Sequence, residues 1–255
     1  MPSFSDDLYL GGARLTPGDP NPAPGANPQQ GGFGVGPLGR VYHWDVGIPV
    51  ATSNTNIVTA AAIGSSLTAV LTAGTGTSFV TNGRGERVLQ LDTPRAVSVT
   101  AAANEAARVV TITGYDRYGQ KMSQDISGLN VNTVLGTKAF WQILLVTISA
   151  ASVGNISVGV TARLGIPVRV TSIVYIIAMR ATATALNAVA AGTVAAADGT
   201  SPATALTGDV RGTVEPTLLD GVNRFVISIL VPAIAAGPNA TRIGAYGVDQ
   251  NLAAQ

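Results

Sequence analysis

Cysteine is absent from this 255-residue chain, and histidine occurs once, as His43. Without cysteine there is neither a disulfide nor a zinc–thiolate site. One histidine and dispersed carboxylates offer no cluster of ligands for another metal ion. The sequence therefore predicts no bound metal and no cofactor.

Charged residues are also scarce, at 11% against roughly a quarter in an ordinary soluble domain. Fifteen basic residues balance 14 acidic ones, and no run of either sign occurs, so we expect no nucleic-acid partner. Of the basic residues 13 are arginines, which suit fixed ion pairs at protein interfaces.

Long apolar runs are missing although the chain is apolar on average. Hydrophobic residues make up 46% and the mean hydropathy is +0.34, yet no stretch reaches the 18 or so residues of a membrane helix. Asp6 and Asp7 lie where a secretion signal would be basic and then apolar. We expect no membrane partner. The remaining explanation of the high mean hydropathy is that other subunits bury apolar surface. We therefore expect a homo-oligomer, in particular a trimer.

Proline and glycine are concentrated in residues 1–39, which hold seven of the 14 prolines and nine of the 30 glycines. Such a segment forms neither a helix nor a central strand, so we expect an extended N-terminal arm. An apolar and acidic stretch precedes the linker and is our candidate for a contact with a partner protein or another subunit: Phe4, Asp6, Asp7, Leu8, Tyr9 and Leu10. The alternative is a disordered tail.

Residues 40–255 are dominated by alternation with a period of two, the pattern of strands with one buried face. Val97 and Val99, and likewise Ile156, Val158 and Val160, alternate with small or polar residues. Arg108–Ser127 predicts a hairpin around Asp116 and Gly119. We expect an all-β fold, an antiparallel β-sandwich or its jelly-roll form, with a subdivision near residue 170. Ala181–Ala197 is expected to be a loop with at most a short helix.

Some runs are apolar on both faces or strongly one-sided. Phe140–Ile148 and Ile173–Met179 are nearly apolar throughout, and Phe225–Val231 places its apolar residues on one side. We expect these strands inside the sandwich or at a subunit contact. Tyr42 and Trp44, on the strand face opposite His43, complete the candidate contact residues.

The sequence patterns that could indicate an enzyme lack the structural context that each one needs. Gly34–Gly39 matches G-x-G-x-x-G by letter, but proline-rich sequence precedes it, a strand follows it and Pro37 donates no N–H. The sequence contains no G-x-S-x-G motif, so no nucleophile elbow is available to act with His43 as the base. A carboxylate pair of a glycosidase is the remaining enzymatic alternative. The acids, however, lie beside turn glycines, and aromatics, at 5%, are few for sugar platforms. We expect a protein that is not an enzyme.

Several stretches resemble head decoration, or cement, proteins of short-tailed bacteriophages. The resemblance rests on Ser5–Ala13, Gly36–Tyr42, Gly114–Gln120, Lys138–Phe140, Ser152–Gly159 and Thr207–Thr213. It implies a β-sandwich trimer seated on the outer surface of the virion capsid, where it binds the major capsid protein and clamps neighbouring capsomers. No catalytic residues carry over from this family. A phage tail, fibre or receptor-binding component is the alternative, although no fixed-period shaft repeat is present.

Overall fold

The computed structural model describes residues 9–10, 39–182, 192–200, 208–217, 219–231 and 250. Strands account for 57% of them, nearly all antiparallel, and these residues include no α-helix. The expected all-β class is therefore confirmed. Phe4, Asp6, Asp7 and Leu8, together with 11–38, lie outside the described residues, so the extended arm stays a prediction.

Nine strands form one large sheet that curls into a half-barrel. Its central path runs β11-β12-β9-β5-β8-β6-β7, with β3 on β9 and β4 on β5. The strands are β3 (Ser53–Ala62), β4 (Thr77–Thr81), β5 (Arg87–Ala101), β6 (Val110–Tyr115), β7 (Lys121–Ile126), β8 (Thr133–Ile148), β9 (Asn155–Gly165), β11 (Gly192–Ala195) and β12 (Thr213–Pro216).

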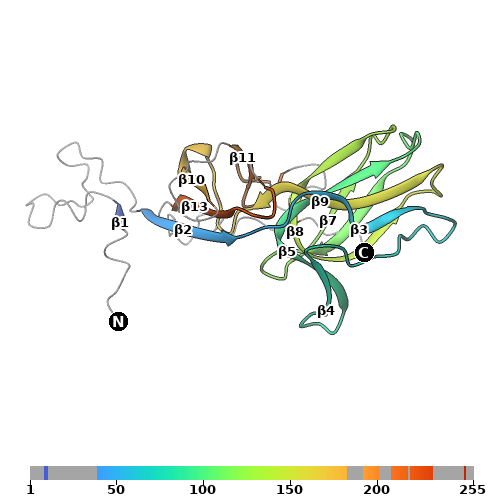
Figure 1. Ribbon diagram of the computed structural model, residues 1–255, viewed down its shortest axis with the longest axis horizontal. Helices are drawn as coiled ribbons and strands as arrows, with labels where there is room; N and C mark the ends of the chain where they lie inside the picture. The colour runs from blue at the N-terminus through green and yellow to red at the C-terminus, as the bar shows by residue number, and fades with distance from the viewer. Residues whose placement is uncertain are drawn as a thin grey trace, which may run out of the picture.

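Two long strands each carry two partners on one edge. β5 pairs with β4 along Arg87–Leu91 and with β9 from Arg95 to Ala101. β9 pairs with β3 toward its start and with β12 at its end. The two ends of β5, and likewise of β9, therefore pair with different strands. The β4–β5 hairpin projects away from the rest of the molecule (Figure 1).

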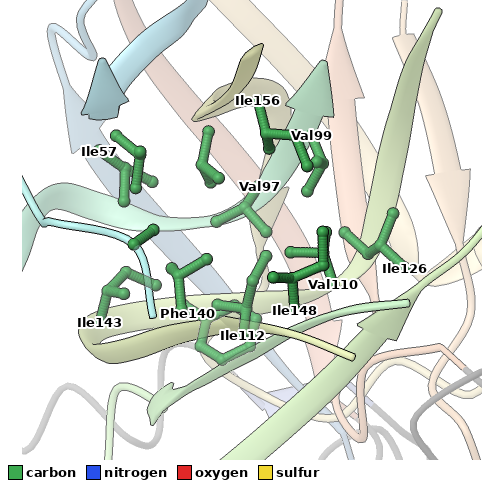
Figure 2. Packing of buried hydrophobic residues seen from close by; sticks show 14 of the residues in the cluster. Ile57, Val97, Val99, Val110, Ile112, Ile126, Phe140, Ile143, Ile148 and Ile156 are labelled. Carbon is green, nitrogen blue, oxygen red and sulfur yellow. The ribbon is translucent and has the colours of Figure 1, made fainter. Parts of the chain in front are cut away.

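The concave side of the large sheet holds the main hydrophobic core. Figure 2 shows aliphatic side chains of β3, β5, β6, β7, β8 and β9 packed together with Phe140. Several are completely buried: Ile57, Val97, Val99, Val110, Ile112, Ile143 and Ile156. Burying such side chains is the main favourable contribution to folding, at about 1.5–3 kcal/mol for each.

A second sheet has the order β1-β2-β13-β10. It comprises β1 (Tyr9–Leu10), β2 (Gly39–Gly47), β10 (Ile176–Thr182) and β13 (Arg224–Val231), and the 3₁₀ helix η2 (Ile173–Tyr175) precedes β10. Trp44, Phe225 and Ile227 of this sheet form a second core with Leu164 and Val214, which belong to the end of the large sheet. The two sheets lie beside each other along the long axis of the molecule (Figure 1).

The expected hairpin is confirmed. β6 and β7 pair from Val110↔Ile126 to Tyr115↔Lys121. Asp116 Oδ1 accepts the backbone N–H groups of Tyr118 and Gln120, at 2.9 and 2.8 Å. Gly119 has φ +75°, which glycine adopts without a steric penalty.

The expectation that alternating strands expose one face to water is wrong for β5 and β9. Ser98, Ser157 and Thr161, on their polar faces, are all buried. On the same face of β9, the backbone of Ser53–Asn54 at the start of β3 approaches so closely that a Cβ on Gly159 would lie 1.7 Å from Ser53 O. Small and polar residues are needed there because backbone, not solvent, covers the strand.

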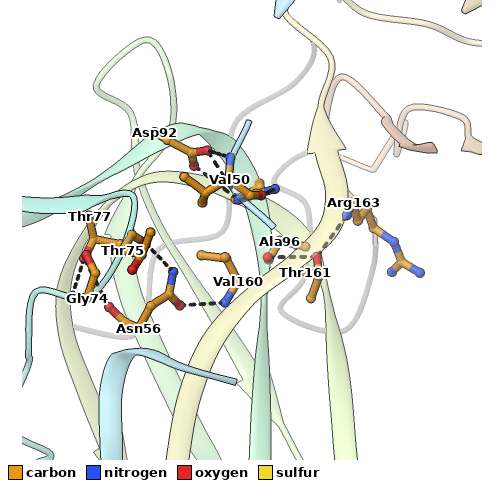
Figure 3. A network of polar contacts seen from close by, with 11 residues as sticks. Val50, Asn56, Gly74, Thr75, Thr77, Asp92, Ala96, Val160, Thr161 and Arg163 are labelled. Carbon is orange, nitrogen blue, oxygen red and sulfur yellow. Dashed lines mark hydrogen bonds and ion pairs between the residues drawn. The ribbon is translucent and has the colours of Figure 1, made fainter. Parts of the chain in front are cut away.

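Hydrogen bonds hold this covering segment in place (Figure 3). Asn56 Nδ2 donates to Thr75 O at 3.1 Å, and Asn56 Oδ1 accepts the N–H of Val160 in β9, also at 3.1 Å. Thr77 Oγ1 donates to Asn56 O at 3.1 Å. Asn56 is 4% exposed, and these protein partners replace the hydrogen bonds to water that its amide loses on burial.

The expectation of a loop over Ala181–Ala197 is wrong at both ends. β10 continues to Thr182, and Gly192–Ala195 form β11 against β12. Residues 183–191 lie outside the described residues.

Candidate functional site

The candidate contact residues that the structure describes all belong to the small sheet. Tyr9 pairs with Arg40 and Leu10 with Gly39, which attaches β1 to the start of β2. Tyr42 and Trp44 follow along β2. The structure thus brings together residues that stand more than 30 positions apart in the sequence.

Tyr42 and Trp44 share one face of β2 but differ in exposure. Trp44 is 3% exposed and packs in the second core, whereas Tyr42 is 40% exposed. Tyr42 therefore offers a ring to a partner, while Trp44 supports the strand from within. A contact role for either residue stays a prediction.

Exposed aliphatic residues lie at the same end of the small sheet. Ile173, Val174 and Ile177 are 57%, 73% and 53% exposed. Tyr42 of β2 is the register partner of Ile229, and Ile229 is the partner of Ile176 in β10. A row therefore runs from Tyr42 to the start of β10, across two strand spacings or about 10 Å. We call Tyr42, Ile173, Val174 and Ile177 the apolar end of the small sheet.

β10 is also an edge strand. It pairs with β13 on one side, and no other described strand pairs with it. The register shifts between Ile176 and Ala178, so Ile177 lies at an irregularity of the edge. Natural proteins protect edges with bulges, and an edge that keeps exposed aliphatic side chains marks an interaction surface.

His43 lies on the opposite face of β2 and is exposed. Its Nδ1 is 2.9 Å from Ser228 Oγ, and the two residues are register partners in neighbouring strands. Within the described part of the chain no group of three or more histidine or acidic residues could hold a metal ion. Among the described residues no carboxylate hydrogen-bonds to His43.

A buried polar cluster is the second notable feature. Arg211 Nη2 donates to Asp116 Oδ2 at 2.9 Å, and both side chains are almost completely buried. Asp209 is buried beside them, and its Oδ2 accepts the N–H of Ala139 at 3.1 Å. The Arg211 guanidinium also lies over the Tyr118 ring, 5.1 Å from its centroid.

Burial shifts the ionisation of this cluster. Desolvation raises the pKa of Asp209, although the Arg211 charge and the backbone N–H groups of Arg211 and Ala139 oppose that shift. Desolvation lowers the pKa of Lys138 to about 8, against the attraction of Asp209, Asp198 and Asp125. Both groups are buried among strands, so we interpret the cluster as structural.

Three of the stretches that carry the family resemblance meet in this cluster. Asp116 comes from Gly114–Gln120, Ala139 from Lys138–Phe140, and Arg211 from Thr207–Thr213. Sequence reasoning identified Asp116 as a turn residue and missed its ion pair with Arg211. No local signal could have revealed it, because Arg211 and Asp116 are 95 positions apart.

Comparison with known proteins adds no name to this geometry: no family profile, curated protein or solved structure matches the chain. Among the described residues, no helix has the length and apolar character needed to cross a membrane.

Proposed function

We propose that the protein is a non-enzymatic subunit of a bacteriophage particle, a decoration or cement protein of the capsid. One observation carries the proposal: β1 pairs with the start of β2 close to the exposed Tyr42, and three exposed aliphatic residues lie at the same apolar end of the small sheet. With 11% charged residues, the chain has few charges to keep such a surface dissolved alone.

The assembled form that we propose is a homotrimer. Exposed side chains on an unpaired edge strand are buried when identical copies meet around a symmetry axis. Ile173, Val174 and Ile177 supply such a surface beside the edge of β10. Copies related by a closed rotation would cover one another's apolar ends and leave no free edge.

The finer fold and the arm belong to the same proposal. Contacts of Trp44 and Phe225 with Leu164 and Val214 favour a sandwich-like packing of the small sheet on the end of the large one. Residues 1–39 then serve as the arm, and β1 fixes one point of it beside the apolar end. From that point the preceding eight residues span up to about 27 Å when extended, enough to reach a neighbouring subunit.

Binding to particles tests the proposal. Undecorated phage heads are mixed with the full chain, with a chain lacking residues 1–39, and with Val70→Ser as a control on an exposed residue elsewhere. We expect the full chain and the control to pellet with the heads, and the truncated chain to stay in the supernatant.

Electron microscopy of the native particle decides the location. Density for the protein on the outer capsid surface, in contact with the major capsid protein, supports the decoration role. Density on the tail or fibres would instead support the alternative, that the protein is a tail component. Equal pelleting of the truncated chain would move the contact from the arm to the β-structured body.

A further inference from the structure

A pocket of about 280 Å³ lies where two hairpin turns meet the middle of β8. The β4–β5 turn supplies Asn82, Gly83 and Arg84, and the β6–β7 turn supplies Arg117 and neighbouring residues. Trp141 and Gln142 of β8 complete the wall. This volume is at the small end of ligand sites and suits one ring-sized group.

The two turns are held in place without a ligand. Arg84 Nη2 donates to Gly119 O at 3.3 Å, across the two hairpins. Asn82 Oδ1 accepts the backbone N–H groups of Arg84 and Glu86, and Asn82 Nδ2 donates to Glu86 Oε2 at 2.8 Å. A site built in advance loses less entropy when its ligand binds.

Carboxylates offset the positive charge of the pocket only in part, because Glu86 attracts Arg84 without forming an ion pair with it. Neither Arg84 nor Arg117 forms an ion pair with any described residue. Asp116 also lines the pocket, but Arg211 occupies its Oδ2 and two backbone N–H groups occupy its Oδ1. The two guanidinium groups are therefore available to an anion.

Aromatic rings hold both guanidinium groups. The Arg84 Cζ atom lies 5.2 Å from the centroid of Tyr115, and the Arg117 Cζ atom lies 5.8 Å from that of Trp44. Packing on a ring orients an arginine while leaving its N–H groups in the plane free to donate. Such a pair of arginines suits a carboxylate.

The remaining lining suits a sugar ring. Trp141 is half-buried and offers an indole surface on which the C–H face of a pyranose can pack. The Gln142 amide, whose Nε2 donates to Gln90 Oε1 at 3.3 Å, can accept a hydrogen bond from a hydroxyl at its oxygen. Aromatics are scarce in the whole chain, yet the fold gathers Tyr115 and Trp141 at this one place.

We infer that the pocket between the β4–β5 and β6–β7 turns binds an acidic sugar, with Arg84 and Arg117 holding its carboxylate and Trp141 its ring. An extended acidic peptide is disfavoured because the volume accommodates one ring-sized group and not a run of residues. The inference is independent of the assembly role, since these residues lie outside the apolar end of the small sheet.

Fluorine NMR on protein labelled with fluorotryptophan tests the inference, because the chain has two tryptophans and gives two resonances. Trp141→Phe assigns them. Titration with methyl glucuronide is expected to shift the Trp141 resonance saturably, with a dissociation constant on the order of 1 mM. Methyl glucoside, acetate and a hexaglutamate peptide should each bind at least about tenfold more weakly.

Three variants sharpen the test. Arg84→Gln and Arg117→Gln should each weaken glucuronide binding about tenfold, because each removes a charged donor. The matched control is Arg87→Gln, an exposed arginine that packs on Phe79 and does not line the pocket. It should bind as the unchanged protein does.

Three results would overturn the inference. One is the absence of a saturable shift, and another is equal binding of glucoside and glucuronide. The third is tighter binding of the peptide, which would make the pocket an acidic-peptide site. Attachment to phage heads should be unaffected by Arg84→Gln, so each proposal can fail without the other.

Discussion

Arg211 and Arg224 represent two extremes of ion pairing in this protein. Arg211 meets Asp116 with side-chain exposures of 4% and 0%, whereas Arg224 meets Asp45 with exposures of 56% and 44%. An exposed pair contributes little to stability because water screens it and both side chains lose freedom. Removing one partner of a buried pair leaves a charge in a medium that cannot solvate it.

We therefore expect Arg211→Met to lower the free energy of unfolding by about 3–5 kcal/mol. Arg224→Met, the matched control, should leave it nearly unchanged. Urea unfolding followed by circular dichroism measures both. Equal effects of the two substitutions would show that the buried cluster does not tie the hairpin to the segment around Arg211.

Lys138 makes stability depend on pH. Its pKa is about 8 in the folded protein, below the ordinary 10.5 that the unfolded chain retains. Between these values the unfolded chain binds a proton that the folded protein has released, so stability rises with pH from about 8 to 10.5. Below pH 8 both states carry the proton and this contribution is constant.

Lys138→Met should abolish that rise, whatever its effect on stability at neutral pH. The measurement is the free energy of unfolding at several values between pH 7.5 and 9.5, for both proteins. Parallel curves for the two proteins would contradict the lowered pKa.

Among the elements, β9 is closely enclosed, because β3 and β5 flank it and the Ser53–Asn54 backbone approaches one face. Gly159 is the point of closest approach, where an added Cβ would lie 1.7 Å from Ser53 O. By contrast, a Cβ added to Gly64 would have no atom within 4 Å.

Gly159→Ala should accordingly destabilise the protein by about 3 kcal/mol or more, since backbone must shift to admit the methyl group. Gly64→Ala should change stability by less than about 0.5 kcal/mol. Thermal unfolding of the two variants beside the unchanged protein checks this. A mild effect at Gly159 would mean that the start of β3 is easily displaced from β9.

At the scale of the whole molecule, the apolar end of the small sheet should govern assembly. Replacing Ile173, Val174 and Ile177 together by serine should convert the proposed trimer into monomers at micromolar concentration, because their apolar surface would no longer favour burial. The matched control replaces three exposed but separated valines by serine: Val70, Val153 and Val222.

Sedimentation equilibrium reads the mass of each species directly. The control should remain trimeric. A monomeric unchanged protein would refute the trimer, and a trimer that survives the triple substitution would place the interface elsewhere on the surface.

Local sequence determined the all-β class and the β6–β7 hairpin. Alternation specifies which residues share a face of a strand, and the Asp116 to Gly119 spacing specifies a turn, because both depend on residues a few positions apart. The one-sided pattern of Phe225, Ile227 and Ile229 likewise identified a buried face, which the second core confirms.

Tertiary structure alone decided what covers each face. Alternation cannot show that Ser53–Asn54 crosses the polar side of β9, nor that Ile173 and Val174 stay exposed despite an apolar sequence. The Arg211–Asp116 pair and the pocket around Arg84 likewise join segments distant in the chain. Such contacts depend on how whole strands pack, and the residues of one strand do not specify which distant segments will pack against it.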